Sequence, residues 1–513
     1  MSSGASSSSR LPERIRFAAL CVLMVGGTAY AATWRIEPGL RGSLQWTDNV
    51  NLVATDRKSD WVTEITPTLV FAGKGAEASV TGSISAPVLL YANTGGSNNR
   101  ILPQANIVGS ATLYPQFLFV DASVQVSQDF ISPFAPRPQN FVSNTANRYT
   151  AQSYRISPFI KGESHGNLQY ELRDTNLWTN ATNVSLTGDR AYTNEIVGHL
   201  TRDPRPLGWG VNYDRVDTQF NAQDSFVTEI GRLNALWQPD PQLQFSLGGG
   251  YEDNRFQFDT FSGATYGGGF KWRPSSRTSV DVDAEHRFFG ASYHVLLLHR
   301  APRSIWTLRA SRDITTYPQN LATLPDQGNV AALLDSLFSS RLTDPAARQA
   351  FVQQLIRERG LPATLTGPLD IFNQQVTLQE SFEGTVNLIG VRNAVLLTAY
   401  RRRTEPIPGS TQVLIDLLST LQTNNTQYGS TVVWTYRLTP LYTLATSADW
   451  FRTDANDESG LQSKQATLQV ALTAPLTKVT SVYAGARYQR FTSNLQSPIE
   501  ESAVFVGINH IFR

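Results

Sequence analysis

The residues of this chain best suited to chemistry are three carboxylates that alternate along one short segment. Asp281, Asp283 and Glu285 are separated by single residues, and Arg287 follows at the same spacing. Alternate side chains of a β-strand share one face and lie about 7 Å apart, so all four would project in one column. Such a column could bind a divalent cation or attract a cationic solute. It could equally be a hydrated row of charges, balanced by Arg287 and by neighbouring strands.

Histidines and glycine runs point to no further site. His286, His294 and His299 are close in sequence, but no pair has a metal-ligand spacing on a common strand face, so we predict no metal site. The glycine runs at 247–253 and 266–272 continue into strand-like sequence, whereas a phosphate-binding loop needs a helix after its glycines. We therefore expect close packing or bending there. Ser, Asp and His residues form no local catalytic signature, and we predict neither an enzyme nor a cofactor.

The elements that would position these residues are amphipathic strands. Residues 118–129, LFVDASVQVSQD, alternate apolar and polar side chains without a break, and the pattern recurs at 79–91 and 278–288. A soluble sandwich would turn the apolar face inward, and a membrane barrel would turn it toward lipid. In the barrel interpretation the polar face lines a wet lumen. The predicted lumen-lining residues are Asp121, Gln125, Asp281, Asp283, Glu285 and Arg287.

Residues 1–31 have the features of an export signal. Arginines precede the apolar run FAALCVLMVGG, and a small-residue site for cleavage ends at Ala31. An uncleaved membrane helix is the alternative, but the run is shorter than the about 20 residues that a span requires. Cys21 is the only cysteine and would leave with the signal, so the mature chain would have no disulfide.

Residues 32–513 are expected to form a single domain. No linker, charge block or low-complexity run divides them, although they exceed the usual size of one soluble core. One large closed sheet would explain this length. The net charge of +1 lacks the basic excess typical of nucleic-acid binding, and we predict no nucleic-acid partner.

Connections between the expected strands alternate between short and long. Ten are short and turn-like, at 72–75, 114–115, 161–166, 202–206, 238–242, 273–277, 300–303, 389–391, 438–440 and 474–478. Longer polar segments, such as 131–147, separate them. Two strands for each turn and one at each end give about 22 strands, within about 20 to 24, with both termini at the short-turn side. The sequence therefore predicts an all-β fold, a transmembrane antiparallel up-and-down β-barrel of the bacterial outer membrane.

Aromatic residues near the expected strand ends support a membrane position, because amphipathic rings favour the headgroup level. They are Trp46, Trp61, Tyr91, Tyr114, Trp237, Trp272, Trp306, Tyr436, Tyr442 and Trp450. The chain ends with Phe512 followed by Arg513, where barrels usually end on an aromatic residue that the assembly machinery reads. We accordingly expect outer-membrane lipid and the barrel assembly machinery as partners.

Two long loops on the extracellular side have helical patterns. The insert 318–372 includes Phe351 and Leu355 at a four-residue spacing, in a segment with capping signals at both ends. The loop 405–425 has leucines at helical spacing; these are Leu414, Leu417, Leu418 and Leu421. The apolar residues of both loops are the predicted gate or lid. The helices could constrict or cap the lumen, pack without gating, or bind an outside partner.

The chain also resembles the PEP-CTERM system-associated outer membrane proteins, a family found with exosortase and exopolysaccharide loci. The phrases that carry the resemblance are WTDNVNL (46–52), YRISPFI (154–160), GYEDNRF (250–256), KWRPSSRT (271–278), EHRFFGASY (285–293) and HRAPRSIWTL (299–308). The resemblance implies an outer-membrane location and an association with the export or assembly of surface polysaccharide or sorted surface proteins. It assigns no catalytic residue.

We therefore expect a barrel that acts as a passage or assembly component for exopolysaccharide or a sorted surface protein, either of which would be its partner. The rival hypothesis is a structural or adhesion barrel. Such a protein would transport nothing and would anchor surface material through its long loops.

Overall fold

The computed structural model describes residues 33–164, 167–182, 190–220, 225–323, 348, 352, 367–370, 373–407 and 423–512. The predicted signal at 1–31 and most of the two helical loops lie outside the described residues. The same is true of every predicted gate residue, namely Phe351, Leu355, Leu414, Leu417, Leu418 and Leu421.

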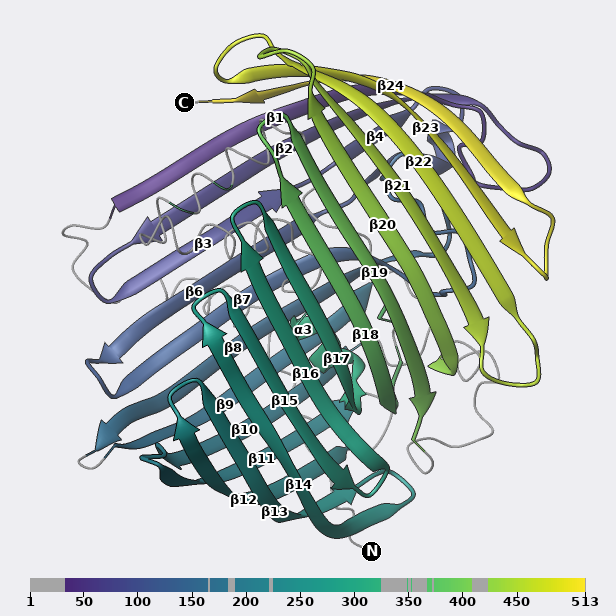
Figure 1. The fold of residues 1–513 in the computed structure, drawn as a ribbon. Coiled ribbons are helices and arrows are strands. Elements are labelled where there is room, and N and C mark those ends of the chain that lie inside the picture. The colour runs from purple at the N-terminus through teal and green to yellow at the C-terminus, as the bar shows by residue number, and fades with distance from the viewer. Residues whose placement is uncertain are drawn as a thin grey trace, which may run out of the picture.

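Antiparallel strands form one closed sheet (Figure 1). In chain order the elements are β1 (Thr33–Thr47), β2 (Asp60–Lys74), β3 (Ala78–Ser85), β4 (Val88–Tyr91), α2 (Gly95–Asn98), β5 (Arg100–Ile101), β6 (Gln104–Tyr114), β7 (Leu118–Phe130), β8 (Arg148–Ser164), β9 (Leu168–Thr182), β10 (Arg190–Arg202), β11 (Leu207–Phe220), β12 (Phe226–Asp240), β13 (Leu243–Arg255), β14 (Thr260–Ser275), β15 (Thr278–Arg287), β16 (Gly290–Ala301), β17 (Ser304–Thr316), α3 (Tyr317–Thr323), β18 (Val376–Ile389), β19 (Asn393–Pro406), β20 (Asn425–Arg437), β21 (Thr443–Ala455), β22 (Gln462–Pro475), β23 (Thr480–Ser493) and β24 (Ile499–Ile511).

The ring closes where β1 pairs with β24. β3 and β4 both pair with β2 and are two parts of one wall strand, and β5 and β6 are two parts of the next. Pro87 and Pro103 lie at these two breaks, where a residue without an N–H cannot continue the ladder. The wall therefore has 22 strands, and the predicted fold and strand number are confirmed.

Short turns lie at one end of the barrel, and long loops lie at the other (Figure 1). All ten predicted turns fall at or beside a junction between consecutive strands. The first and last strands meet at the short-turn end, where the Phe512 N–H donates to the Pro38 carbonyl at 2.8 Å. In bacterial outer-membrane barrels the short turns are periplasmic, so the long loops are extracellular.

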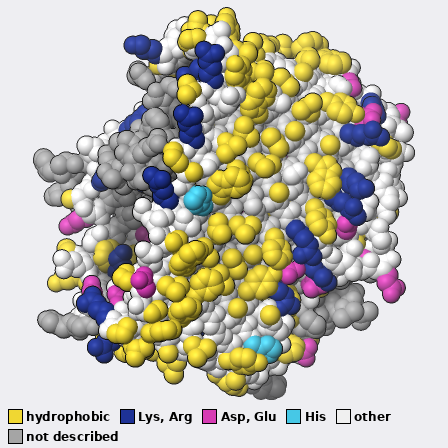
Figure 2. Space-filling model, in the orientation of Figure 1, with side chains coloured by type: hydrophobic (Ala, Val, Ile, Leu, Met, Phe, Trp, Pro, Cys, Tyr) yellow, Lys and Arg dark blue, Asp and Glu magenta, His cyan; other side chains and the backbone are white. Residues whose placement is uncertain are grey.

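The outer face of the wall is apolar between its two ends. Figure 2 shows hydrophobic side chains over the strands, with Lys and Arg gathered toward the strand ends. Among the most exposed are Leu247, at 72%, and Leu233, at 66%. Backbone polar groups are satisfied within the closed sheet, which allows such a surface to face lipid. No helix within the described residues is long and apolar enough to cross a membrane.

Most of the predicted girdle aromatics lie on this outer surface. Those that are at least two-fifths exposed are Trp61, Tyr114, Trp237, Trp272, Trp306, Tyr442 and Trp450. Tyr91 is different, since its side chain is only 5% exposed and its hydroxyl donates to the Val142 carbonyl at 2.7 Å. The girdle prediction for Tyr91 is wrong, because this ring faces the interior and packs against a loop.

Inward-facing glycines bring β12 to β15 close together. A Cβ on Gly267 would lie 2.3 Å from the Ala284 carbonyl oxygen, and one on Gly250 would lie 2.1 Å from the Gly231 carbonyl oxygen. Neighbouring backbone therefore occupies the space of a side chain. This confirms close packing as the role of the glycine runs.

Candidate functional site: the lumen and the loops that cross it

The predicted lumen residues of β7 lie on its polar, inward face. The Arg173 guanidinium of β9 extends past β8 and donates to the Asp121 carboxylate at 2.8 Å. Arg173 also pairs with Glu171 at 3.0 Å. Gln125 lies directly opposite Asn106 on one side and Ser153 on the other. The inner wall is thus polar here, and the carboxylate of Asp121 is neutralised by a neighbour.

The carboxylate column of β15 is divided by ion pairs. Glu285 pairs with Arg232 of β12 at 2.9 Å, and Arg232 pairs in turn with Asp214 of β11 at 2.9 Å. Arg232 reaches across β13 and β14. Gly250 of β13 lies directly opposite Arg232 and Gly267 of β14 lies directly opposite Glu285, so neither position has a side chain to block the contact. The interpretation as a balanced row of charges fits Glu285 best.

Asp281 and Asp283 do not complete a cation site with Glu285. Asp281 has one buried carboxylate oxygen without a hydrogen-bond donor, and the side chain of Asp283 is exposed. No group of three His, Cys, Asp or Glu side chains in the described part of the chain is arranged to hold a metal ion.

Arg287 is the most buried of the predicted lumen residues. Its guanidinium donates to Glu252 at 2.9 Å and to Asp313 at 2.6 Å. The Arg287 and Glu252 side chains are 6% and 1% exposed. Glu252 also accepts from the Phe288 N–H at 2.7 Å, so the pair has its hydrogen bonds largely satisfied. With Glu252 and Asp313 as partners, Arg287 joins β13, β15 and β17, and its own charge is balanced within the wall.

An apolar cluster lies beside this ion pair at the extracellular end of the lumen. Phe256 contacts Phe226, Phe261 and Phe288 with ring centroids 5.8 to 6.5 Å apart. The buried members of the cluster are Ala191, Phe220, Phe226, Phe256, Val376, Leu378 and Ile407. They come from β10, β11, β12 and β18 and from the ends of β13 and β19, so the cluster joins two parts of the wall that β14 to β17 separate around the ring.

The loop 131–147 crosses the lumen. It connects β7 to β8, yet its middle contacts β21 and β22, which are separated from β7 around the ring by β23, β24 and β1 to β6. The Arg137 N–H donates to Gln465 at 3.0 Å, and the Gln465 amide donates back to the Arg137 carbonyl at 2.9 Å. The Arg137 guanidinium lies 3.9 Å from the Phe451 ring centroid and donates to Thr453 at 3.4 Å.

A second contact fixes the same loop to β23 and β24. The Ser143 hydroxyl donates to Glu501 at 2.7 Å, and Thr47 of β1 donates to the same carboxylate at 2.7 Å. Arg487 pairs with Glu501 at 3.3 Å, and the Glu501 side chain is fully buried. One carboxylate thus joins the loop, the barrel seam and β23.

Apolar contacts support the return of this loop toward β8. Val142 is 2% exposed and packs in a cluster with Val50, Val62, Leu89, Tyr91 and Leu102. The loop is therefore held by burial as well as by polar contacts, over the extracellular half of the lumen.

The start of the insert 318–372 also reaches the opposite wall. α3 leaves β17 and contacts β8, β9 and β10, although β11 to β16 lie between them around the ring. The Tyr317 and Tyr149 hydroxyls are 2.7 Å apart, and Leu321 is 1% exposed. The described part of the insert thus lies inside the barrel.

The end of the insert is bound to the wall as well. Asp370 pairs with Arg402 of β19 at 2.5 Å, and both side chains are buried. The Leu369 N–H and carbonyl make two hydrogen bonds with the Gln427 amide, at 2.9 and 3.1 Å. Residues 317–323 and 367–370 therefore belong to one inward-folded connection.

Burial sets the ionisation of two loop residues. Burial lowers the pKa of Arg137 to about 10, so its guanidinium stays charged at neutral pH and can face the Phe451 ring. Burial also raises the pKa of Tyr317 well above its usual value, and the nearby Asp129 adds to the shift. Tyr317 stays protonated and can donate to Tyr149.

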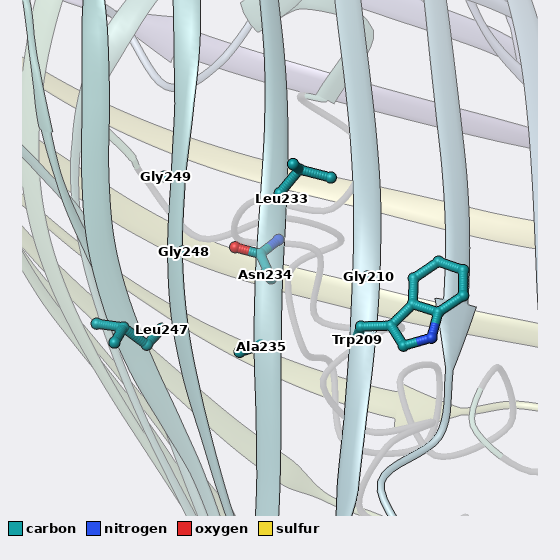
Figure 3. A pocket seen from close by; sticks show the side chains of 8 residues that line it. All are labelled: Trp209, Gly210, Leu233, Asn234, Ala235, Leu247, Gly248 and Gly249. Atoms are coloured by element: carbon teal, nitrogen blue, oxygen red, sulfur yellow. The ribbon is translucent and has the colours of Figure 1, made fainter.

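A hollow of about 600 Å³ lies at the wall of β11 to β13 (Figure 3). Trp209, Leu233 and Leu247 border it on the outer face, with small residues such as Ala235 between them. The hollow is open and mostly apolar, and it offers no group for catalysis.

Sequence reasoning missed the loop 131–147 as a lumen element. We predicted only a long polar connection there, whereas the structure buries Phe134, Arg137 and Val142 from it. The available signal was the presence of apolar residues within this long loop. Apolar side chains stabilise a loop only when they are buried, so they indicated that part of the loop packs against the barrel.

Comparisons with known proteins agree with the barrel architecture. No protein-family model matches the chain, and no curated protein matches it by sequence. Among solved structures, the FrpB iron transporter from Neisseria meningitidis is similar with a TM-score of 0.50 and 9% identity, over 93% of this chain and 81% of that chain.

Two further structures have lower scores. The siderophore receptor PirA from Pseudomonas aeruginosa has a TM-score of 0.41 and 10% identity, over 92% of this chain and 80% of that chain. A loop L8 deletion mutant of OmpT, an outer membrane protein of Vibrio cholerae, has a TM-score of 0.33 and 8% identity, over 94% of this chain and 100% of that chain. With the closed sheet and its apolar outer band, the chain is an outer-membrane β-barrel.

Proposed function

We propose that this barrel is a gated passage, or an assembly component, for exopolysaccharide or a sorted surface protein leaving the cell. The wall of 22 strands encloses a lumen far wider than side chains alone can fill. Its polar inner face, with Asp121, Gln125 and Glu285, suits a hydrated solute. The resemblance to proteins found with exosortase and exopolysaccharide loci supplies the proposed cargo.

One observation carries the gating part of this proposal. The loop 131–147 crosses the lumen and binds β21 to β24 through Arg137 and Ser143. Both contacts join the loop to side chains of the wall, Gln465 and Glu501. The backbone hydrogen bonds between the strands do not include them, so the loop could separate from the wall while the wall stays intact. Release of this loop and of α3 would open a path.

The rival proposal is a structural or adhesion barrel. It is favoured by the depth of the loop contacts, because Glu501 and Asp370 are buried and paired like permanent core residues. In that case the lumen stays filled, and the extracellular loops hold surface material.

Both proposals can be tested in the producing cell by deleting the gene and collecting exopolysaccharide or sorted protein from cells and medium. A passage predicts that material accumulates inside the envelope of the deleted strain. A surface anchor predicts normal secretion with loss of the material into the medium. Complementation with a chain whose 131–147 segment is replaced by a short Gly/Ser linker should restore export if the loop is only a gate.

A further inference from the structure

The outer face of the barrel has a row of cations at one level above its apolar band. Arg401 of β19 lies opposite Tyr428 of β20, Tyr428 lies opposite Arg452 of β21, and Arg452 lies opposite Lys464 of β22. All four side chains are on the face that bears the exposed Leu397, Trp434, Trp450 and Leu468 on the same strands. They thus form a continuous polar row facing away from the lumen.

The level of this row places it at the membrane surface. Trp450 is 43% exposed and lies two residues from Arg452 on the same face of β21. An outward tryptophan at the end of the apolar band marks the headgroup region. Arg401, Arg452 and Lys464 therefore lie at the height of the outer-leaflet headgroups, on the extracellular side. In Figure 2 Lys and Arg side chains gather along this margin.

The row has more cationic charge than its own neighbours neutralise. Arg452 and Lys464 are directly opposite each other, an arrangement of like charges that destabilises a sheet. Arg452 pairs with Asp454 at 2.8 Å, and Arg401 pairs with Glu380 at 3.1 Å. Within the described residues Lys464 makes no ion pair, and its side chain is exposed.

Each arginine keeps donors for a ligand. A guanidinium has five N–H donors, and one carboxylate occupies at most two of them. Arg401 also hydrogen-bonds to the Tyr428 hydroxyl, which still leaves N–H donors on Arg401 and the O–H donor of Tyr428. The remaining donors of Arg401 and Arg452, with the Lys464 ammonium and the Tyr428 hydroxyl, fit the oxygen atoms of a phosphate group. A bound phosphate would also remove the repulsion between Arg452 and Lys464.

We propose that Arg401, Tyr428, Arg452 and Lys464 bind the phosphate groups of a phosphorylated glycolipid in the outer leaflet. The site is independent of any passage through the lumen. The position and charge of the site determine the kind of ligand. The ligand must be anionic to bind cations, must belong to the lipid layer, and must be large enough to extend from β19 to β22.

The test is a lipid titration of the full mature barrel in neutral detergent, following the shift of its thermal unfolding midpoint. The probes are diphosphorylated lipid A, its dephosphorylated form and phosphatidylglycerol. Wild type should bind diphosphorylated lipid A at least about tenfold more tightly than either other lipid. The double variant Arg452→Gln/Lys464→Gln should lose this preference. Arg255→Gln, an outward arginine on β13, is the matched control and should keep it.

A second measurement separates binding from general stability. In neutral detergent without phospholipid, Lys464→Gln should raise the unfolding midpoint slightly because it removes a like-charge pair. With diphosphorylated lipid A the order should reverse, because wild type gains more from the ligand. The proposal is overturned if the double variant binds as tightly as wild type, or if phosphatidylglycerol or dephosphorylated lipid A binds equally well.

Discussion

At the residue scale, three inward charges of the wall are paired with side chains on other strands: Asp121 with Arg173, Glu285 with Arg232, and Arg287 with Glu252. Asp121, Glu285 and Arg287 could be assigned to one face because every second residue of a strand shares it. Their partners, Arg173, Arg232 and Glu252, could not be identified. They lie on other strands, and the pairing depends on which neighbours lack side chains, as Gly250 and Gly267 do.

The glycines beside these pairs give a clear prediction. Gly267→Ala should lower the free energy of unfolding by about 1–3 kcal/mol, because the added Cβ meets backbone that must shift. Gly231→Ala is the control, since its Cβ would have open space around it within 4 Å, and its effect should be much smaller. Equilibrium urea unfolding in detergent micelles measures both. Equal losses of unfolding free energy in the two variants would mean that close packing at Gly267 does not contribute to stability.

Arg137 should hold the lumen loop through its buried side chain. Arg137→Ala removes the contact with the Phe451 ring and the hydrogen bond to Thr453, and should cost about 1–3 kcal/mol of unfolding free energy. Arg303→Ala, at an exposed periplasmic turn, should have almost no effect. Urea unfolding again provides the measurement. An unchanged midpoint for Arg137→Ala would show that the side chain does not hold the loop.

At the scale of elements, the wall strands were predictable because strand period and turn residues are local signals. All ten short turns were found from Pro, Gly, Asp and Ser in the sequence. Inward folding of the loops was harder to predict. It depends on contacts between segments far apart in the chain, as between 131–147 and β22. Tyr91 was misassigned for the same reason, because its partner Val142 belongs to that loop.

Docking of α3 across the lumen can be tested with a double-mutant cycle. Tyr149→Phe or Tyr317→Phe alone removes the hydrogen bond between the two buried hydroxyls, and each should cost about 1 kcal/mol or more. The double variant should cost less than the sum of the two, since both hydroxyls are then absent. Urea unfolding of the four proteins gives the coupling energy. Strict additivity would argue against the contact between α3 and β8.

At the scale of the whole molecule, the number of strands and the membrane location were predictable from the alternation of short and long connections. How the lumen is filled was not, because the inward folding of a loop depends on contacts between distant segments, as between 131–147 and β22. The predicted gate residues Phe351 and Leu414 lie outside the described residues and stay a prediction. The loop 131–147 and α3 are the lumen-crossing elements that the structure describes.

The most direct test of a loop-gated passage is single-channel conductance of the refolded mature chain in a planar bilayer. The comparison variant has residues 131–147 replaced by a short Gly/Ser linker. The control variant has the same replacement at 494–498, where Leu495 is 76% exposed. We predict low conductance for wild type and control, and large, long-lived openings for the 131–147 variant. If that variant stays as silent as wild type while circular dichroism shows an intact barrel, the gated-passage account is contradicted.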